Sequence, residues 1–314
     1  MSNRYIKGTH HESPIFGSDK AGDGLYKDLP LAVVDQARSP YKVFFENFET
    51  QMASGALGAN LGLSGCTITQ KGTATGATAT ISGVNNYLDL YAGTAVDVGL
   101  EYQFILAPNA LTTISPDLHL LGPITTTATF MDGKELFWEA RIGIQSDTSA
   151  TWTGSMLVGW CVTDADIIEE TTGALQLAAG GGFGFYASGD VATGELGYFS
   201  SAGAVTAVDA NTNVNIATDM LAETAGDIKW YKLGARMRCI DASASTGHVD
   251  FFVNDKKVGS VVNANCMDAD AEVFSFTVCN INGPGTDDTH VLVDYVMSGI
   301  TRDGLVWPYT TGTW

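Results

Sequence analysis

Hydrophobic and polar residues alternate along several stretches of the chain, most regularly between residues 230 and 262. The odd positions from 231 to 239 are apolar, and the positions between them hold Lys232, Gly234, Arg236 and Arg238. The same period of two recurs at Val249, Phe251 and Val253. Such a period indicates a strand with one buried face. This stretch therefore predicts three strands, the last two joined by a tight turn at Asn254-Asp255.

Two further runs, ELFWEARIGI (135–144) and SMLVGWCV (155–162), show the same alternation. The short polar link between them predicts a hairpin. Shorter runs predict additional strands at 41–48, 66–70, 77–82, 85–91, 101–107, 180–190, 194–201, 273–279 and 291–297. Residues 164–175 are the best candidate for a short helix, with Asp164 as its cap and acidic residues in its first turn.

About a dozen predicted strands and a single predicted helix favour an all-β sandwich or jelly roll. We expect four parts: an extended N-terminal arm at 1–40, a β-rich segment at 41–130, a jelly-roll core at 131–302 and a C-terminal tail at 303–314. The pattern leaves open whether 41–130 belongs to the sandwich or forms a small subdomain.

The two terminal parts lack a clear period but contain scattered apolar residues. A fully disordered tail would contain fewer of them. Two interpretations of the arm stay open: it orders against a partner, or it folds back on its own domain. The candidate partner-binding residues are Tyr5, Ile6, Ile15, Phe16, Leu25, Tyr26, Leu31, Trp307, Tyr309 and Trp314.

The chain is strongly acidic, with a formal net charge of -19 over 314 residues. Residues 1–50 are nearly neutral, with six Lys/Arg and seven Asp/Glu, and no basic residue occurs between Arg141 and Lys229. This balance argues against nucleic-acid binding through a basic face. The acidic residues predict a solvated surface that resists aggregation. The alternative is a surface for divalent cations or a basic partner.

The five cysteines, at 66, 161, 239, 266 and 279, form no CxxC motif and no regular framework. An odd count without a framework favours folding in a reducing compartment, although a Cys266–Cys279 bridge is an open alternative. The first residues lack an apolar signal-peptide core, and no run of about 18 apolar residues is present. We therefore expect a protein made in a cytoplasm, with no membrane span.

The sequence shows no set of residues typical of a catalytic site. No GxSxG motif occurs, and none of the histidines (His10, His11, His119, His248 and His290) has a convincing set of catalytic partners. Glu135 and Glu139 flank Trp138, but they alternate with core residues and so belong to the exposed side of a strand. Trp152, Tyr186, Tyr198 and Trp307 are candidates for stacking on a glycan, or else for the core.

Residues 209–215 place oxygen-bearing side chains at alternate positions, which suits calcium. The run departs from a calcium loop at Val214 and Met220, where Gly and Glu would be needed. Turn residues rich in Asp and Asn are the alternative interpretation. We expect no other cofactor.

ELFWEARIGI, WYKLGARMRCI with HVDFFVNDKKVGSV, and VLVDYVMSGITR together resemble a concanavalin A-like, laminin-G-type jelly roll. Such folds can hold calcium at a loop rim, which makes Asp209, Asn211, Asp287 and Asp288 the candidate ligands. Glycosidases of this fold often carry an E-x-D-x-x-E strand, which this chain lacks, so we expect no enzyme.

The whole chain also resembles virion structural proteins of tailed bacteriophages, through its Gly-rich arm, the entry YKVFFENF and its Thr/Gly/Ala-rich body. This resemblance implies a capsid decoration (cement) protein on the capsid surface. Its partner would be the major capsid protein, and it would form a homo-oligomer. One alternative is a tail-fibre, head-fibre or receptor-binding module that recognises cell-surface glycan, and another is a glycan-cleaving enzyme.

Overall fold

A computed structural model describes the chain in separate segments, and every structural statement below concerns these residues. They are 41–46, 67–71, 77–81, 87–95, 98–103, 124–125, 135–147, 152, 154–162, 167–168, 175–177, 181–187, 196–201, 205–208, 225–241, 246–262, 273–282 and 288–301. Their regular structure consists of 17 strands.

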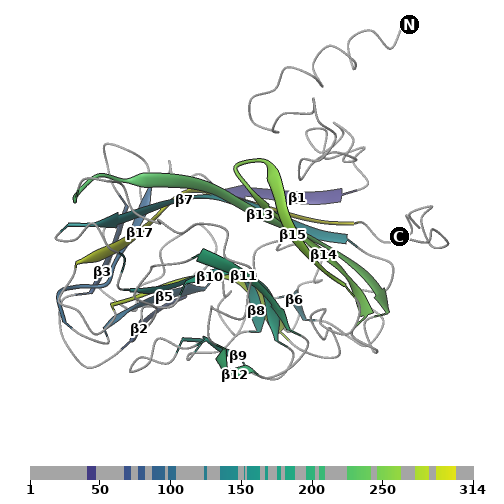
Figure 1. Cartoon of the computed structure of the whole chain (residues 1–314), viewed down its shortest axis with the longest axis horizontal. Coiled ribbons are helices and arrows are strands. Elements are labelled where there is room, and N and C mark those ends of the chain that lie inside the picture. Colours follow the sequence, from purple (N-terminus) through teal and green to yellow (C-terminus); the bar gives the residue numbers. More distant parts are fainter. Residues whose placement is uncertain are drawn as a thin grey trace, which may run out of the picture.

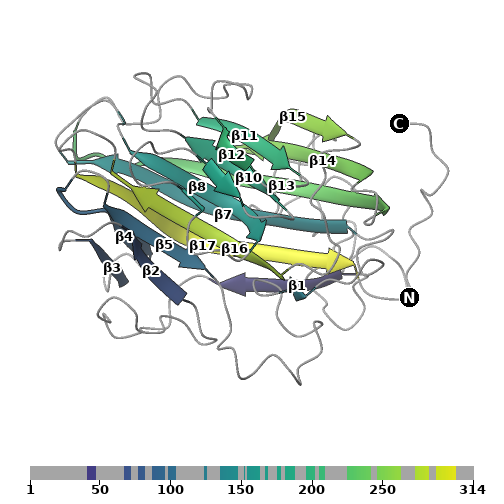
Figure 2. The ribbon, with the colours of Figure 1, turned by 90° about the horizontal axis from the view of Figure 1, so that it is seen from below.

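The first layer is an eight-stranded antiparallel sheet. Its strands lie in the order β15 (Lys256–Val262), β14 (Thr246–Val253), β13 (Lys229–Asp241), β7 (Glu135–Ser146), β17 (Thr289–Thr301), β4 (Leu88–Tyr91) and β3 (Thr78–Ile81). Strand β1 (Tyr41–Glu46) also pairs with β17, next to β17's C-terminal half. Strands from both ends of the chain therefore meet in this layer (Figure 2).

The second layer is a seven-stranded antiparallel sheet. Its order is β11 (Leu196–Ser201), β10 (Gly182–Ala187), β8 (Ser155–Val162), β16 (Val273–Ile281), β5 (Gly99–Gln103) and β2 (Thr67–Lys71). Strand β6 (Ile124–Thr125) pairs with the start of β16, and β9 (Leu175–Leu177) pairs separately with β12 (Val205–Val208). In Figure 1 the eight-stranded sheet is uppermost, the seven-stranded sheet lies below it, and the β9–β12 pair is at the bottom.

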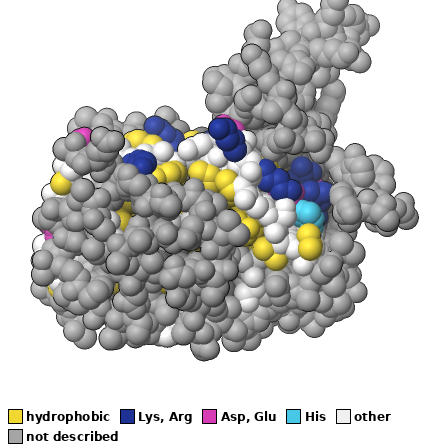
Figure 3. Space-filling view, viewed as in Figure 1, with side chains coloured by type: hydrophobic (Ala, Val, Ile, Leu, Met, Phe, Trp, Pro, Cys, Tyr) yellow, Lys and Arg dark blue, Asp and Glu magenta, His cyan; other side chains and the backbone are white. Residues whose placement is uncertain are grey.

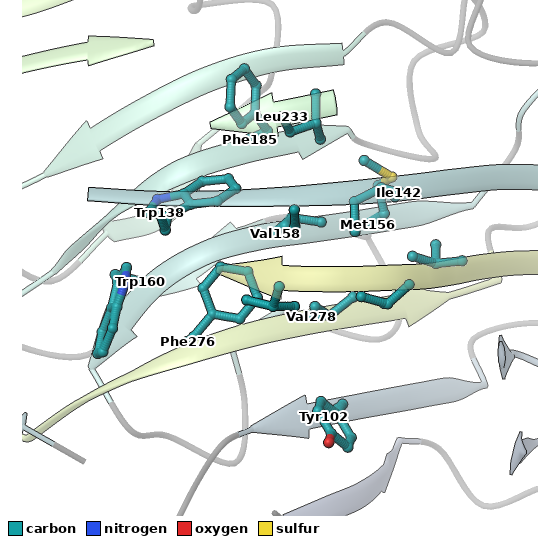
Figure 4. Close-up of a cluster of buried hydrophobic side chains, with 14 of the residues drawn as sticks. Tyr102, Trp138, Ile142, Met156, Val158, Trp160, Phe185, Leu233, Phe276 and Val278 are labelled. Carbon is teal, nitrogen blue, oxygen red and sulfur yellow. The ribbon is translucent and has the colours of Figure 1, made fainter. Parts of the chain in front are cut away.

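The main core lies between the two sheets and consists of the alternating apolar residues that the sequence predicts to be buried. Trp138 of β7 meets Phe185 of β10 edge-on at 5.9 Å and Phe276 of β16 at 5.3 Å, measured between ring centroids (Figure 4). Burial of such large rings supplies much of the hydrophobic stabilisation of a sandwich. The predicted all-β jelly-roll sandwich class is confirmed, whereas its expected N-terminal arm lies outside the described residues.

A second apolar cluster covers the other side of the seven-stranded sheet. Its buried members are Leu157, Cys161, Ile167, Ile168, Leu175, Tyr186, Phe199, Cys279 and Ile281. All eight residues of β8 are buried, because this strand has protein on both faces. Cys161 and Cys279 are buried thiols rather than disulfide partners, so the alternative of a Cys266–Cys279 bridge is not realised.

Buried amide side chains tie the two layers together at one end of the sandwich. Asn280 of β16 donates hydrogen bonds to the carbonyl oxygens of Leu90 at 2.7 Å and Thr289 at 2.9 Å, both in the opposite sheet. Asn282 donates to the carbonyl of Gly93, and the Thr289 hydroxyl donates to the Asn282 carbonyl oxygen at 2.5 Å. Buried polar groups with satisfied hydrogen bonds favour one relative position of the two sheets.

Two expectations about local structure are wrong. The helix expected at 164–175 does not include the described residues of that range, because Ile168 makes a β-bridge with Leu175 and both side chains are buried in the second apolar cluster. The hairpin expected between 135–144 and 155–162 is also absent, because β7 and β8 belong to different sheets. Both cases share a cause: the apolar side chains are buried by contacts with distant strands, which a local pattern does not encode.

Candidate functional site

The outer face of the eight-stranded sheet, which points away from the core, carries most of the polar side chains with defined partners. Along β7 this face holds Glu135, Phe137, Glu139, Arg141 and Gln145, in register with outward residues of β13 and β17. Figure 3 shows Lys and Arg side chains gathered over the upper layer, with a His beside them. This concentration stands out in a chain whose net charge is -19.

One end of the outer face holds a set of ion pairs that we call the ionic cluster: Glu135, Arg236, Arg238, His248, Asp250 and Lys257. One guanidinium nitrogen of Arg236 donates to both carboxylate oxygens of Glu135, at 3.1 and 2.9 Å. Arg238 donates to Asp250 at 2.9 Å. Glu135, Arg236 and Asp250 are each at most 6% exposed, so these interactions are shielded from water and have fixed geometry.

Asp250 is the centre of the ionic cluster. Its carboxylate accepts hydrogen bonds from His248 at 2.5 Å, from Ser260 at 2.8 Å and from Lys257 at 2.7 Å, in addition to the one from Arg238. Burial alone would raise the pKa of Asp250. The hydrogen bonds from His248, Lys257 and Ser260 outweigh burial and hold this pKa well below its ordinary value. Asp250 is therefore ionised and unsuited to act as a general acid.

The middle of the outer face is buried rather than solvated. Phe137 is fully buried, Glu139 is 1% exposed and Met297 is 3% exposed. The Tyr295 hydroxyl donates to Glu139 at 2.7 Å, and the Lys232 ammonium lies 3.7 Å from the same carboxylate. Burial and the charge of Glu139 raise the pKa of Tyr295 well above its ordinary value, so the phenol keeps its proton as a hydrogen-bond donor.

The opposite end of the outer face holds an aromatic cluster: Tyr87, Trp230 and Arg141. The Tyr87 and Trp230 rings meet edge-on at 6.0 Å, and the Arg141 guanidinium lies 4.5 Å from the Trp230 ring centroid. Arg141 also donates to Asp294 at 2.7 Å. Gly143 leaves room for the indole, because a Cβ there would lie 3.0 Å from the Trp230 ring. Tyr87 and Trp230 are only half-buried.

On the same face, His290 lies between Asp89 and Asp147. Its Nδ1 is 2.9 Å from Asp89 and its Nε2 is 3.6 Å from Asp147, while Tyr91 stacks on the imidazole at 4.6 Å and donates to Asp288 at 3.3 Å. Burial alone would lower the pKa of His290. The hydrogen bond and charge of Asp89, together with Asp147, outweigh burial and raise the pKa above 6.5.

The structure agrees with some of the residue roles expected from the sequence and contradicts others. Glu135 and Glu139 lie on the outer face as expected, but they are buried and ion-paired, not exposed. Trp152, Tyr186 and Tyr198 are buried, which contradicts their candidacy as glycan-stacking residues and supports the core alternative. Asp288 accepts a hydrogen bond from Tyr91. His248 and His290 lie near the start of strands β14 and β17, as expected.

The remaining candidates fall outside the described residues. These are the partner-binding set Tyr5, Ile6, Ile15, Phe16, Leu25, Tyr26, Leu31, Trp307, Tyr309 and Trp314, the metal candidates Asp209, Asn211 and Asp287, and the aromatic residue Trp307 among the glycan candidates. Within the described part of the chain, no group of three or more His, Cys, Asp or Glu is arranged to hold a metal ion. No helix among those residues is long and apolar enough to cross a membrane.

The sequence reasoning missed Trp230 and Tyr87, although one signal was present. Trp230 falls in the polar phase of β13, two residues before Lys232. A large aromatic residue in that phase should point outward. The carboxylates of Glu135, Glu139 and Asp250 are held by cations and hydroxyl groups, whereas the rings of Tyr87 and Trp230 are half-buried on the same face.

No family model matches the sequence, and no curated protein sequence matches it. Several solved structures match this chain at low similarity. The carbohydrate recognition domain of Emp46p has 9% identity and a TM-score of 0.45, covering 76% of this chain and 89% of that chain. Peanut lectin has 10% identity and a TM-score of 0.45, covering 83% and 97%. An endo-1,3-beta-glucanase from Streptomyces sioyaensis has 14% identity and a TM-score of 0.42, covering 84% and 98%.

Proposed function

We propose that this chain is a non-catalytic structural protein of a tailed bacteriophage virion, which decorates and stabilises the capsid. The observation that supports it most is the ionic cluster, in which buried ion pairs hold the polar side chains of the outer face in place before any partner binds. A surface whose side chains are already immobilised loses little conformational entropy on docking. The resemblance of the whole sequence to virion proteins supplies the proposed partner, the major capsid protein.

In this proposal the sandwich is the rigid body and residues 1–40 attach it to the capsid. The inter-sheet hydrogen bonds of Asn280 and Asn282 keep the two layers from sliding. A body that resists shear can transmit load between neighbouring capsid subunits. Burial of surface across the joints between subunits would stabilise the assembled lattice by mass action.

Co-sedimentation with purified capsids that lack this protein tests the proposal. The full chain should pellet with capsids and raise the temperature at which they release DNA. Deletion of residues 1–40 should abolish pelleting while leaving a folded body by circular dichroism, and Lys257→Glu should weaken it by removing one cation of the ionic cluster. Absence of pelleting by the full chain would contradict the proposal.

The aromatic cluster favours a second function, recognition of a neutral glycan. Half-buried Trp230 and Tyr87 offer apolar ring surface, and Arg141, Asp89 and Gln145 place polar groups on the same side of the sheet. A sugar ring has the matching character, with apolar C–H faces and a rim of hydroxyl groups. Asp89, Asp147 and Asp288 nearby carry negative charge and so disfavour an acidic glycan.

Binding to immobilised mannan and laminarin, with alginate as the acidic comparison, tests this second function. Trp230→Ala should abolish retention on a neutral glycan, whereas Lys257→Ala, at the ionic end, should not. Retention of the Trp230→Ala variant, or a preference for alginate, would count against the aromatic cluster as the site.

We further propose that the chain is not an enzyme. Glu135 is paired with Arg236, and Glu139 with Tyr295 and Lys232, so neither carboxyl group is placed to protonate a leaving group. Incubation with the same polysaccharides should release no reducing ends. Release that is lost in Glu135→Gln or Glu139→Gln would refute this proposal.

A further inference from the structure

Strand β15 lies at one edge of the eight-stranded sheet and, among the described residues, pairs only with β14 (Figure 1). It is also a markedly exposed strand, since its seven residues are all exposed or half-buried, whereas every residue of β8 is buried. An edge strand presents a row of backbone N–H and C=O groups to which another strand can pair.

The two halves of β15 differ in how well they are protected from such pairing. The first half carries Lys256 and Lys257 and contains an irregularity in its pairing with β14, between Phe251 and Phe252. Charged lysines and bulges are the devices that commonly block edge pairing. The second half, Gly259–Val262, follows β14 in unbroken register and carries no charge.

The end of the second half also exposes apolar surface. Val262 is 53% exposed, an unusual value for a large hydrophobic residue among the described residues. Its neighbours on the same strand are Ser260 and Val261, of which Ser260 is exposed and Val261 half-buried. An uncharged, regular, partly apolar edge is a favourable site for β-strand addition.

We propose that the Gly259–Val262 half of β15 pairs antiparallel with the same segment of a second copy of this chain. The two eight-stranded sheets would then continue into each other across a two-fold axis. The same surface would be used by both copies, as symmetric dimers require. This inference does not depend on the proposed capsid or glycan functions.

The distribution of lysines along β15 fits a partner that is a second copy. Pairing centred on Val261 places Ser260 of one copy opposite Val262 of the other, and all paired side chains then point to matching faces of the two sheets. The two Lys257 residues then lie eight positions apart, roughly 26 Å along the strands. That separation exceeds the Debye length of about 8 Å at physiological ionic strength, so the like charges scarcely repel.

The distribution of charge in the chain also favours contact between two copies at the edge formed by β15. Two copies with a net charge of -19 repel each other over most of their surfaces. Around β15, however, five basic residues (Lys232, Arg236, Arg238, Lys256, Lys257) and four acidic residues (Glu135, Glu139, Asp250, Asp255) give a formal charge of only +1. Two copies that approach each other through this region therefore repel each other much less than two copies that approach through the rest of their surfaces.

Analytical ultracentrifugation of the full chain over a range of concentrations tests the inference. We expect a concentration-dependent dimer whose dissociation constant rises at least tenfold in Val262→Lys, because the two new charges would lie only two positions apart, on the same face of the joined sheets. The matched control is Thr94→Lys, which adds the same charge at an exposed residue far from β15 and should leave the dimer unchanged.

Hydrogen–deuterium exchange of the unmodified chain gives a second readout that needs no variant. Amides of Gly259–Val262 should exchange more slowly as protein concentration rises, whereas those of β3, at the opposite end of the same sheet's strand order, should not change. A chain that is monomeric at all concentrations, or a dimer that survives Val262→Lys, would overturn the inference. Either result leaves the capsid and glycan experiments unaffected, so failures of the three ideas can be told apart.

Discussion

At the scale of single residues, burial determines how much each ion pair of the outer face contributes to the stability of the fold. The Arg141–Asp294 pair is short, but both side chains reach water, with 44% and 29% of their surfaces exposed. Asp250, in contrast, is 8% exposed at its side chain and is surrounded by donors from three strands. Exposed ion pairs contribute little to the stability of the fold. Removing one partner of a buried ion-pair network, in contrast, leaves an uncompensated buried charge and is strongly destabilising.

Replacing Asp250 should therefore be far more destabilising than replacing Asp294. Asp250→Asn removes the negative charge that faces Arg238, His248 and Lys257 and should lower the free energy of unfolding by about 3 kcal/mol. Asp294→Asn, the matched control, should lower the free energy of unfolding by less than about 1 kcal/mol. Urea denaturation monitored by tryptophan fluorescence measures both, and equal effects would mean that the ionic cluster is not shielded from solvent.

His290 should make stability depend on pH. Its pKa is raised in the folded state by Asp89 and Asp147, so protonated His290 stabilises the fold. This contribution is fully present below the unfolded value of about 6.5 and is lost as pH rises through the higher folded pKa. Tyr91 stacks on the same imidazole and does not reverse the sign.

The measurement is the difference in unfolding free energy between the unmodified chain and His290→Gln at several pH values. We expect this difference to be larger at pH 5.5 than at pH 9, since Gln can hydrogen-bond to Asp89 but cannot carry a proton. A difference that stays constant over this range would exclude His290 as the titrating group.

At the scale of elements, the β14–β15 hairpin illustrates what local chemistry can specify. Asn254 and Asp255 both have positive φ, at 50° and 66°, as the tight turn expected from the sequence requires. The turn is also held from outside, because Asn254 exchanges hydrogen bonds with the backbone of Lys232 on β13. The sequence thus predicts the turn itself, whereas its anchor on a third strand comes from the sheet.

The same hairpin touches the other layer at Gly259. A Cβ at this position would overlap the hydroxyl group and ring of Tyr198 on β11, which stacks on Phe251 at 4.5 Å. Gly259→Ala should therefore destabilise the fold by about 1–3 kcal/mol through overpacking. In a Tyr198→Ala background the same change should cost much less, and a double-mutant cycle measures the difference. Additive effects would show that the two residues do not touch.

At the scale of the whole molecule, the two layers are joined by apolar packing and, among the described residues, by hydrogen bonds of the buried Asn280 and Asn282 side chains. Asn280 is fully buried and uses its amide to satisfy carbonyl groups of Leu90 and Thr289 across the sandwich. A buried hydrogen bond of this kind contributes roughly 0.5–1.5 kcal/mol to stability. The relative position of the sheets therefore depends in part on amide side chains that no periodic pattern identifies.

Asn280→Ala should lower the free energy of unfolding by about 2 kcal/mol, because two buried hydrogen bonds to carbonyl groups of the opposite layer are lost. Chemical denaturation measures the loss. Gln145→Ala, which removes the exposed amide hydrogen bond to Asp147, is the control for loss of an amide and should lower the free energy of unfolding less. A smaller effect at Asn280 than at Gln145 would show that the connection between the layers contributes little.

Much of this molecule follows from its sequence alone, because strand alternation is a local property of the chain. The period of two at 231–239 and at 135–144 fixes which side of each strand is apolar, and Asn254-Asp255 fixes a turn. Together with the number of such runs, these patterns establish the all-β class and assign residues such as Trp138 and Phe251 to the core.

Only the tertiary structure decided which strands pair and what their polar sides contact. Residues 135–146 and 155–162 enter different sheets, and Glu135 meets Arg236 across 101 positions of sequence. Burial of Glu135, the position of Arg141 against Trp230 and the exposed edge of β15 all depend on neighbours far along the chain. Period and composition describe each strand by itself, whereas pairing and burial are properties of the assembled sheets.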